Sequence, residues 1–324
     1  MNIMFTSGGR RVELINDFKE TIKDSLIIAG DFDETSPVNY FVDKTYKLPF
    51  IIDENYMKEI FSICKKENID VVIPLIDYEL DYYAKYKKLF MDHGIMMLIS
   101  DEKFISLSLD KLLTSKVMNE INIMVPKTTL LEDYCGQYSE VDKVILKPRK
   151  GSASKGIYTI EGIKVGQFVE LLGINKNSYI VQEYIESEYE LTVDVFIDHK
   201  SNIVELCQRK RLKVRAGEVE RSVTVYDERV TKLVELIVKE FKPFGVINIQ
   251  FLYSLKDNEF YLVEINPRFG GGYPHSFKAG ANFIEHIKNE RLGRSHISYL
   301  NNRRYKKDYY CFRYDNAVYK ESLT

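Results

Sequence analysis

Oxygen-bearing side chains gather near the end of two strand-like runs late in the chain. If the hairpin between these runs is symmetric about Asp257, Gln250 lies directly opposite Glu264. Alternation along the strands then puts Asn248 and Asn266 on the same face as Gln250 and Glu264. Amide and carboxylate oxygens suit Mg²⁺, which keeps several waters and binds substrate phosphates. We therefore expect Gln250, Glu264 and Asn266 to hold a magnesium ion.

Arg268 follows in the run Glu-Ile-Asn-Pro-Arg, where it could stabilise charge on a transferring phosphoryl group. The other face of the same hairpin is predicted to be apolar, and the residues expected there are Ile247, Ile249, Phe251, Val263 and Ile265. A polar, solvated face of an antiparallel sheet would show the same alternation, so the pattern leaves that alternative open.

A second pattern joins a lysine to a loop of small residues. Lys147 ends an apolar run, and Gly151 to Gly156 (GSASKG) follow shortly after it. Such a loop allows backbone amides to approach phosphate oxygens, and the lysine adds a point charge. The spacing of a P-loop is absent, and a basic hairpin tip would look the same.

A third pattern is the run Val-Gln-Glu-Tyr-Ile at residues 181–185, followed by a short acidic link. Its backbone could contact a purine edge, and an acid just beyond it could accept hydrogen bonds from ribose hydroxyls. A plain surface connection explains the same residues.

The elements that position these patterns fall into two classes. Up to about residue 100, strand-like runs alternate with helical runs, which predicts a parallel sheet covered by helices. A glycine-bearing turn, Ser7 to Gly9, follows the first strand and favours an anion, but SGGRR lacks the dinucleotide-binding spacing. Asp31 ends the second strand, where it could hold a ribose or be an ordinary loop residue. After residue 125 the runs predict antiparallel strands.

Composition limits the kinds of protein that this chain can be. The chain has 324 residues, 45% of them hydrophobic, which suits a globular protein of about two domains. The formal net charge of -2 argues against nucleic-acid binding. The four cysteines and five histidines show no zinc spacing. No apolar run of transmembrane length and no signal-like segment occur, so we expect a cytoplasmic protein without membrane contacts.

The order of the three patterns resembles the ATP-grasp superfamily, and most closely the ATP-grasp module of the carbamoyl-phosphate synthetase large subunit and its small stand-alone relatives. The resemblance spans residues 1 to about 290 and includes the opening FTSGGRRVEL. It implies an α/β parallel-sheet domain (1–108), an α+β lid with a linking helix (109–186) and a C-terminal antiparallel-sheet domain with a tail (187–324).

The resemblance also implies a role for each matched residue. Phosphates would contact Lys111 and Lys147 under a loop that includes Gly151, Ser152 and Gly156. Adenine would lie against Gln182, Glu183 and Ile185, and Glu190 would hold the ribose. Mg²⁺, or Mn²⁺ in its place, would bind Gln250, Glu264 and Asn266. Arg268, Lys147 and Arg211 would serve catalysis, and substrate would lie near Arg209, Gly271 and His275.

The implied activity is an ADP-forming ligase that joins a small carboxylate to an amine or thiol through an acylphosphate. Homodimers occur among small relatives. The alternatives are a carbamoyl-phosphate synthetase-like subunit that needs a partner chain, a kinase of small acids, or an ATP-binding module without catalysis. The single ATP-grasp module argues against complete carbamoyl-phosphate synthesis.

Overall fold

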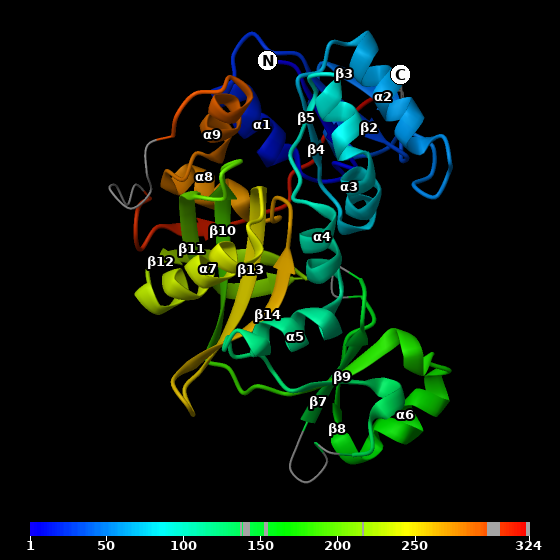
Figure 1. Ribbon diagram of the computed structural model, residues 1–324, viewed down its shortest axis with the longest axis vertical. Helices are drawn as coiled ribbons and strands as arrows, with labels where there is room; N and C mark the ends of the chain where they lie inside the picture. The colour runs from blue at the N-terminus through cyan, green and yellow to red at the C-terminus, as the bar shows by residue number, and fades with distance from the viewer. Residues whose placement is uncertain (137, 139–142, 152–154, 216, 297–304, 322–324) are drawn as a thin grey trace.

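The computed structural model describes residues 1–136, 138, 143–151, 155–215, 217–296 and 305–321, and within these ranges it contains three separate sheets (Figure 1). One sheet is parallel, and the other two are antiparallel. The expected fold class, an α/β domain followed by a lid and an antiparallel domain, is confirmed.

The N-terminal domain is built on the parallel sheet, with strand order β3-β2-β1-β4-β5. Its strands β1 and β4 are short, mostly apolar and fully buried, as expected for strands covered on both faces. The strands are β1 (Ile3–Thr6), β2 (Ile27–Asp31), β3 (Lys44–Lys47), β4 (Val71–Pro74) and β5 (Met96–Met97). The covering elements are α1 (Val12–Thr21), η1 (Pro37–Tyr40), α2 (Tyr56–Lys66) and α3 (Asp77–Asp92).

Two short helices lead from this domain into the lid. They are α4 (Glu102–Leu109) and α5 (Lys111–Glu120). The carboxylate of Asp110 accepts hydrogen bonds from the amides of Leu112 and Leu113, so it caps α5. Arg149 of the lid pairs with the same carboxylate at 2.7 Å. Lys111 is therefore held at the first position of a capped helix, next to the lid.

The lid is the antiparallel sheet of order β6-β9-β7-β8 with one helix packed on it (Figure 1). Its strands are β6 (Thr128–Leu130), β7 (Lys143–Pro148), β8 (Tyr158–Glu161) and β9 (Tyr179–Glu183), and the other elements are η2 (Leu131–Asp133), η3 (Gly162–Lys164), α6 (Val165–Leu172) and η4 (Lys176–Ser178). A small apolar core that includes Val144, Leu146 and Val169 joins α6 to the sheet.

The C-terminal domain carries the sheet of order β14-β13-β10-β11-β12-β15. Its strands are β10 (Tyr189–Ile197), β11 (Ile203–Arg215), β12 (Glu218–Val225), β13 (Gly245–Ser254), β14 (Glu259–Asn266) and β15 (Tyr310–Phe312), and its helices are α7 (Glu228–Phe241), α8 (Tyr273–Ala279) and α9 (Phe283–Arg291). One face of the sheet buries alternate apolar residues, among them Val193 and Ile249, against Val234 of α7. The other face buries apolar residues at one end, among them Phe196 and Val246, and carries polar side chains along the rest of β10, β13 and β14.

The hairpin of β13 and β14 has the predicted register, because Gln250 pairs with Glu264. The prediction for its apolar face is wrong at one position. The register shifts beyond Gln250, so Phe251 pairs with Leu262. Leu262 is buried in the core, whereas Val263 is only half-buried. A β-bulge of this kind adds one residue to a strand and moves the side chains beyond it.

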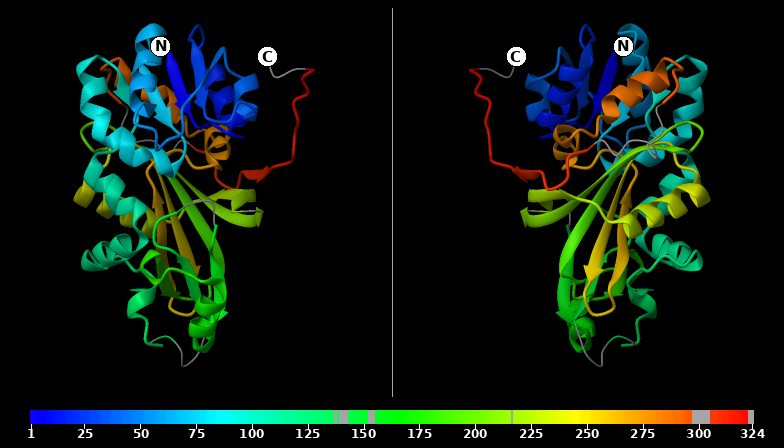
Figure 2. Two further views of the ribbon diagram at one scale, coloured as in Figure 1. Left: turned by 90° about the vertical axis from the view of Figure 1, so that its right-hand side faces the viewer. Right: turned by 90° about the vertical axis from the view of Figure 1, so that its left-hand side faces the viewer.

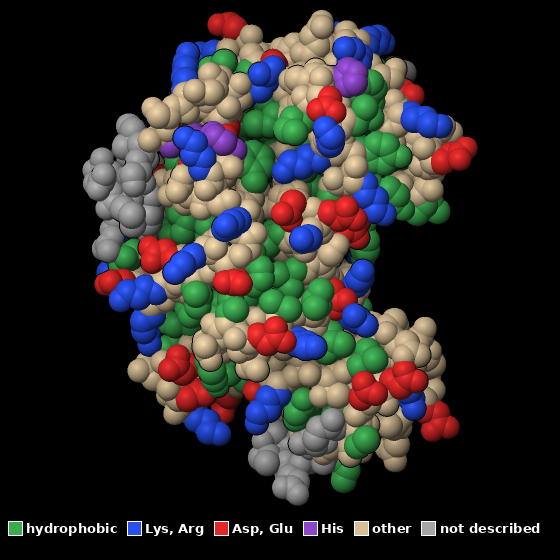
Figure 3. All heavy atoms as spheres, in the orientation of Figure 1, with side chains coloured by type: hydrophobic (Ala, Val, Ile, Leu, Met, Phe, Trp, Pro, Cys, Tyr) green, Lys and Arg blue, Asp and Glu red, His purple; other side chains and the backbone are tan. Residues whose placement is uncertain are grey.

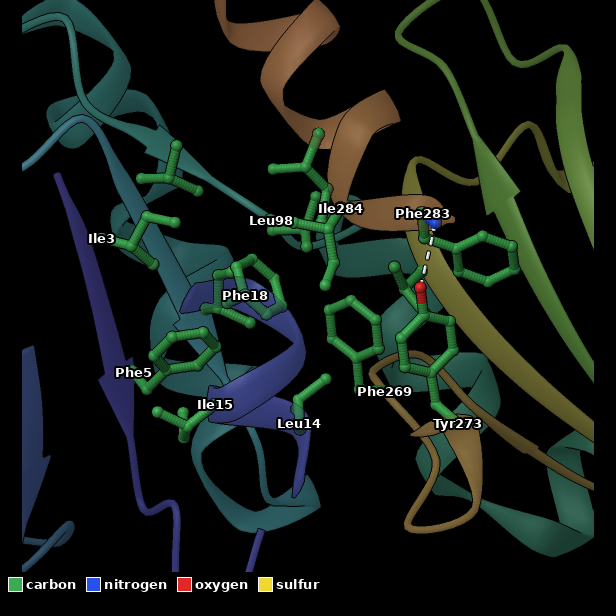
Figure 4. Packing of buried hydrophobic residues seen from close by; sticks show 14 of the residues in the cluster. Ile3, Phe5, Leu14, Ile15, Phe18, Leu98, Phe269, Tyr273, Phe283 and Ile284 are labelled. Atoms are coloured by element: carbon green, nitrogen blue, oxygen red, sulfur yellow. Dashed lines mark hydrogen bonds between the residues drawn. The ribbon is translucent and has the colours of Figure 1, made fainter. Parts of the chain in front are cut away.

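Aromatic rings join the N-terminal domain to the C-terminal one (Figure 4). The ring of Phe18 on α1 lies 4.9 Å from Phe5 and 5.9 Å from Phe269, measured between centroids. Phe269 in turn lies 4.7 Å from Tyr273 at the start of α8. This shared core fixes the loop after β14 against α1.

The chain's last described segment returns toward the N-terminal domain (Figure 2). β15 pairs with the edge strand β12, so Ser222 lies opposite Cys311. Residues Tyr310–Phe312 therefore extend the C-terminal sheet by one strand.

Candidate active site

A cavity of about 260 Å³ lies where the N-terminal domain meets the polar face of the C-terminal sheet. Its residues come from the position before α1, from the segment after β4, from five neighbouring strands of the C-terminal sheet with the turn between β11 and β12, and from the loop after β14. They are Arg11, Leu75, Ile76, Asp77, Thr192, Arg209, Arg211, Gly217, Glu218, Val219, Asn248, Gln250, Glu264, Asn266, Arg268 and Gly270 to Gly272.

Strand register explains why so many polar side chains meet here. Gln250 on β13 pairs with Glu264 on β14 and with Thr192 on β10. Asn248, two residues earlier on the same face, pairs in the same way with Asn266. The predicted magnesium ligands therefore lie together on one wall of the cavity.

Glu264 is the carboxylate of this set. The ammonium of Lys111 lies 3.5 Å from its Oε1, and the side-chain amide of Asn266 donates to its Oε2 at 3.4 Å. Gln250 and Asn266 add amide oxygens beside it. One carboxylate with two amides and an adjacent cation fits a hydrated Mg²⁺ that also binds phosphate oxygens.

Arg268 is held from both domains. Its Nη2 lies 2.5 Å from Oδ2 of Asp77, at the start of α3 in the N-terminal domain. The same nitrogen donates to Oδ1 of Asn266 at 3.3 Å. Nη1 donates to the carbonyl of Phe269 at 3.0 Å. The guanidinium is thus fixed next to the predicted metal ligands, as a group facing a phosphoryl must be.

Arg211 lies on the adjacent strand and contacts two other predicted residues. Its Nη1 is 2.7 Å from Oε2 of Glu190, and it donates to Oε1 of Gln250 at 3.5 Å. Its Nε is buried and has no hydrogen-bond partner among the described residues. Arg211 therefore connects Glu190, which the resemblance places at the ribose, to Gln250, one of the predicted metal ligands.

Arg209 forms the floor of the cavity. Its side chain is almost fully buried, with Nη2 2.7 Å from the equally buried Oδ2 of Asp194. Asp194 also accepts hydrogen bonds from Asn248 and Ser276. Two of the three guanidinium nitrogens are therefore committed to Asp194 and Ser276.

The predicted phosphate and adenine residues lie on the lid side rather than on the cavity wall. Lys147 on β7 is buried, and burial lowers the pKa of its ammonium to about 8, with Glu264 opposing that shift. Lys111 donates to the carbonyl of Gly151 at 2.8 Å and lies 3.5 Å from Glu264, so it connects the start of the predicted phosphate-binding loop to Glu264. Ser152 lies outside the described residues.

The other lid residues occupy β9 and the segment after it. Gln182 is buried and donates to the hydroxyl of Thr128 at 2.8 Å. Glu183 and Ile185 are half-buried. Gly156, at the end of the loop, has a φ of 70°, and a Cβ there would lie 2.6 Å from the hydroxyl of Tyr179. Figure 3 shows the surface hollowed between the lid and the N-terminal domain.

The structure brings Gly271 to the cavity wall but not His275. His275 is buried in α8, with Nδ1 2.8 Å from the hydroxyl of Ser222 and Nε2 2.9 Å from the carbonyl of Tyr309. Burial, together with the nearby Arg209, lowers the pKa of His275 to about 4. Its ring is therefore neutral at physiological pH.

Several cavity residues were not predicted: Arg11, Asp77, Thr192 and Glu218. Asn248 lies in the cavity wall on the polar face predicted for it, two residues before Gln250. Asp77 follows a buried parallel strand, and the carboxyl ends of such strands are the usual place for ligands.

Asp31 has a local role. Its carboxylate accepts hydrogen bonds from the amides of Gly9 and Asp33 and from the hydroxyl of Ser36. It therefore orders the turn after β1, which agrees with the second alternative above, that Asp31 is an ordinary loop residue.

This geometry agrees with what sequence and fold comparisons find. The sequence model of the ATP-grasp domain matches residues 108–272, more than half of the chain. The chain belongs to the ATP-grasp family. A model described as PylC-like, N-terminal domain matches residues 3–98 of this ATP-grasp protein.

Curated relatives are larger than this chain. It is 24% identical over 254 residues to the carbamoyl phosphate synthase large chain, N-terminal section, of Aquifex aeolicus, covering 70% of this chain and 43% of that one. It is also 24% identical over 305 residues to the carbamoyl phosphate synthase large chain of Saccharolobus islandicus, covering 87% of this chain and 28% of that one. The chain thus spans less than half of the length of either relative.

Solved structures share the fold at low identity. The biotin carboxylase domain of 2-oxoglutarate carboxylase from Hydrogenobacter thermophilus, in complex with MgADP and bicarbonate, has a TM-score of 0.74 at 17% identity, covering 95% of this chain and 73% of that one. N5-carboxyaminoimidazole synthetase from Staphylococcus aureus, in complex with ADP, has a TM-score of 0.74 at 16% identity. The match covers 92% of this chain and 79% of that one. Within the described residues, no helix has the length and apolarity to span a membrane.

Proposed function

We propose that this ATP-grasp protein is an ATP-dependent ligase that joins a small carboxylate to an amine, or to a thiol, and forms ADP and phosphate. One observation supports it above the others. Glu264, Asn266 and Arg268 line one cavity, and the ammonium of Lys111 lies 3.5 Å from Glu264. This combines a set of oxygen donors for a cation with basic groups for phosphates.

The proposed reaction has two steps. First, a carboxylate oxygen attacks the γ-phosphorus of ATP, the bond to the β-phosphate bridging oxygen breaks, and ADP leaves. Second, the lone pair of the amine attacks the acyl carbon, phosphate leaves with the bonding electrons, and the amine loses a proton. The product is an amide.

The residues contribute position and charge rather than covalent chemistry. Lys147 and Lys111 bind phosphate oxygens, and Arg268 stabilises charge on the transferring phosphoryl group. Gln250, Glu264 and Asn266 hold Mg²⁺, which neutralises phosphate oxygens when bound. Gln182, Glu183, Ile185 and Glu190 bind the nucleoside.

A direct test incubates the protein with ATP, Mg²⁺ and a pool of acids and amines, and reads ADP and new products by mass. The pool contains acetate, succinate, glutarate and the common amino acids. Lys147→Ala and Glu264→Ala are the controls. ADP release that requires both an acid and an amine, with a condensed product, supports the ligase.

Other outcomes distinguish the alternatives. ADP release with an acid alone, and an accumulating acyl phosphate, indicates a kinase. ATP binding without ADP release from any mixture argues against catalysis by the isolated chain. If a second subunit then restores turnover, the result favours the alternative of a carbamoyl-phosphate synthetase-like subunit that works only with a partner chain.

A further inference from the structure

Arginines line the cavity on several sides, and most of them have a carboxylate partner. Within the described residues, Arg209 pairs with Asp194, Arg211 with Glu190 and Arg268 with Asp77, at 2.7, 2.7 and 2.5 Å. Arg11 also lines the cavity but forms no ion pair in the described part of the chain. Its Nη1 donates a hydrogen bond to the carbonyl of Phe269 at 2.9 Å.

The same carbonyl accepts a hydrogen bond from Arg268 at 3.0 Å. Two guanidinium groups therefore lie side by side on one oxygen. Asp77 is close to both, but its carboxylate pairs with Arg268. Burial, with the charge of Arg268, lowers the pKa of Arg11 to about 9. An anion bound beside Arg11 would offset this repulsion.

The place of Arg11 in the chain also points to a ligand. Arg11 occupies the position before the first residue of α1 and makes no side-chain capping bond there. Arginine is not a favoured cap, and a cation at a helix N-terminus is opposed by the helix dipole. Local helix stability therefore does not explain this residue, whereas anion binding does.

We propose that Arg11 binds a carboxylate of a substrate, on the N-terminal-domain side of the cavity. This proposal rests on the proposed ligase function. The planar guanidinium suits a carboxylate because it can donate two parallel hydrogen bonds. The carboxylate belongs either to the acid that is phosphorylated or to an amine substrate that carries its own acid group.

A binding test needs no turnover. Phenylglyoxal modifies arginine side chains, and peptide mass mapping measures the modified fraction of Arg11 and Arg10 separately. Arg10 is the matched control, because it is exposed and lines a different cavity. Each acid of the pool is added singly with MgADP, with chloride at equal ionic strength as the reference. We expect at least one carboxylate to protect Arg11 without protecting Arg10, and protection of neither by any acid overturns the proposal.

Kinetics then identify the source of the carboxylate. Hydroxylamine traps the acylphosphate, so hydroxamate yield measures the first step without an amine. For Arg11→Gln we expect the KM of one substrate to rise about tenfold or more, the usual effect of losing a charged hydrogen bond. A raised KM for the acid in the hydroxamate assay identifies the phosphorylated acid, and a raised KM for the amine alone identifies the second substrate.

Matched variants separate substrate binding from structure. Arg10→Gln should leave both KM values unchanged, and Arg11→Lys should restore part of the affinity. If Arg11 only holds the Phe269 carbonyl, Arg11→Gln lowers the unfolding temperature and leaves both KM values as they were, which contradicts the proposal. A wild-type protein that binds acids through Arg11 but releases no ADP would contradict the ligase function instead.

Discussion

At the scale of single residues, burial decides which charged groups respond to pH. Lys147 is buried on β7, and its pKa of about 8 means that the amine is mostly charged below that pH and mostly neutral above it. Arg209 is buried as well, but its guanidinium is held by Asp194 and Ser276. The first residue can gain or lose its charge near neutral pH, and the second serves as a fixed part of the floor.

The Lys147 ammonium gives ATP binding a predictable pH dependence. Phosphates favour the charged form, so the affinity for ATP should be constant below about pH 8 and should fall by up to tenfold per pH unit above it. Equilibrium titrations with MgATP between about pH 7 and 10 measure this. Lys147→Arg should move the fall in affinity to higher pH, because a guanidinium has a higher pKa than an ammonium in the same environment. An unchanged pH dependence in Lys147→Arg would exclude Lys147 as its source.

The buried pair of Arg209 and Asp194 should matter mainly for stability. Arg209→Met leaves the Asp194 carboxylate buried without its partner, which costs about 3–5 kcal/mol of unfolding free energy. Arg211→Met is the matched control, because its partner Glu190 is half-exposed and the loss should be about 1 kcal/mol or less. Urea unfolding measures both, and equal losses would contradict this distinction.

At the scale of elements, the register of β13 and β14 could be predicted, whereas the bulge between them could not. Strand alternation and the turn around Asp257 were sufficient to pair Gln250 with Glu264. The shift that buries Leu262 in place of Val263 depends on packing against α7 and α5, which alternation does not encode.

The loop after β14 combines a crowded glycine with an open one. A Cβ on Gly270 would lie 2.6 Å from Nδ2 of Asn248, which is itself bonded to Asp194, whereas a Cβ on Gly271 would have no atom within 4 Å. Gly270→Ala should therefore lower the unfolding free energy by about 1–3 kcal/mol, and Gly271→Ala should leave it nearly unchanged. Denaturant midpoints of the two variants test this, and equal midpoints would show that Asn248 can move aside.

At the scale of the whole molecule, the sequence predicted the arrangement of sheets and the C-terminal wall of the site. The cavity wall from the N-terminal domain was not predicted. Arg11 and Asp77 are more than 100 residues from Glu264 along the chain, and the contacts that bring them together are tertiary: the rings of Phe18 and Phe269 and the pairing of Asp77 with Arg268. Periodicity in a single chain carries no signal for such contacts.

The central claim is that one cavity transfers the γ-phosphoryl group of ATP to a carboxylate. The most direct measurement uses the pool of acids with heavy oxygen in their carboxylates and reads the mass of the released phosphate. We predict one heavy oxygen in each phosphate from the wild-type protein, since the oxygen leaves with phosphate when the amine attacks. Glu264→Ala should release neither ADP nor labelled phosphate. ADP release by the wild-type protein with only unlabelled phosphate would contradict an acylphosphate and, with it, the proposed ligase.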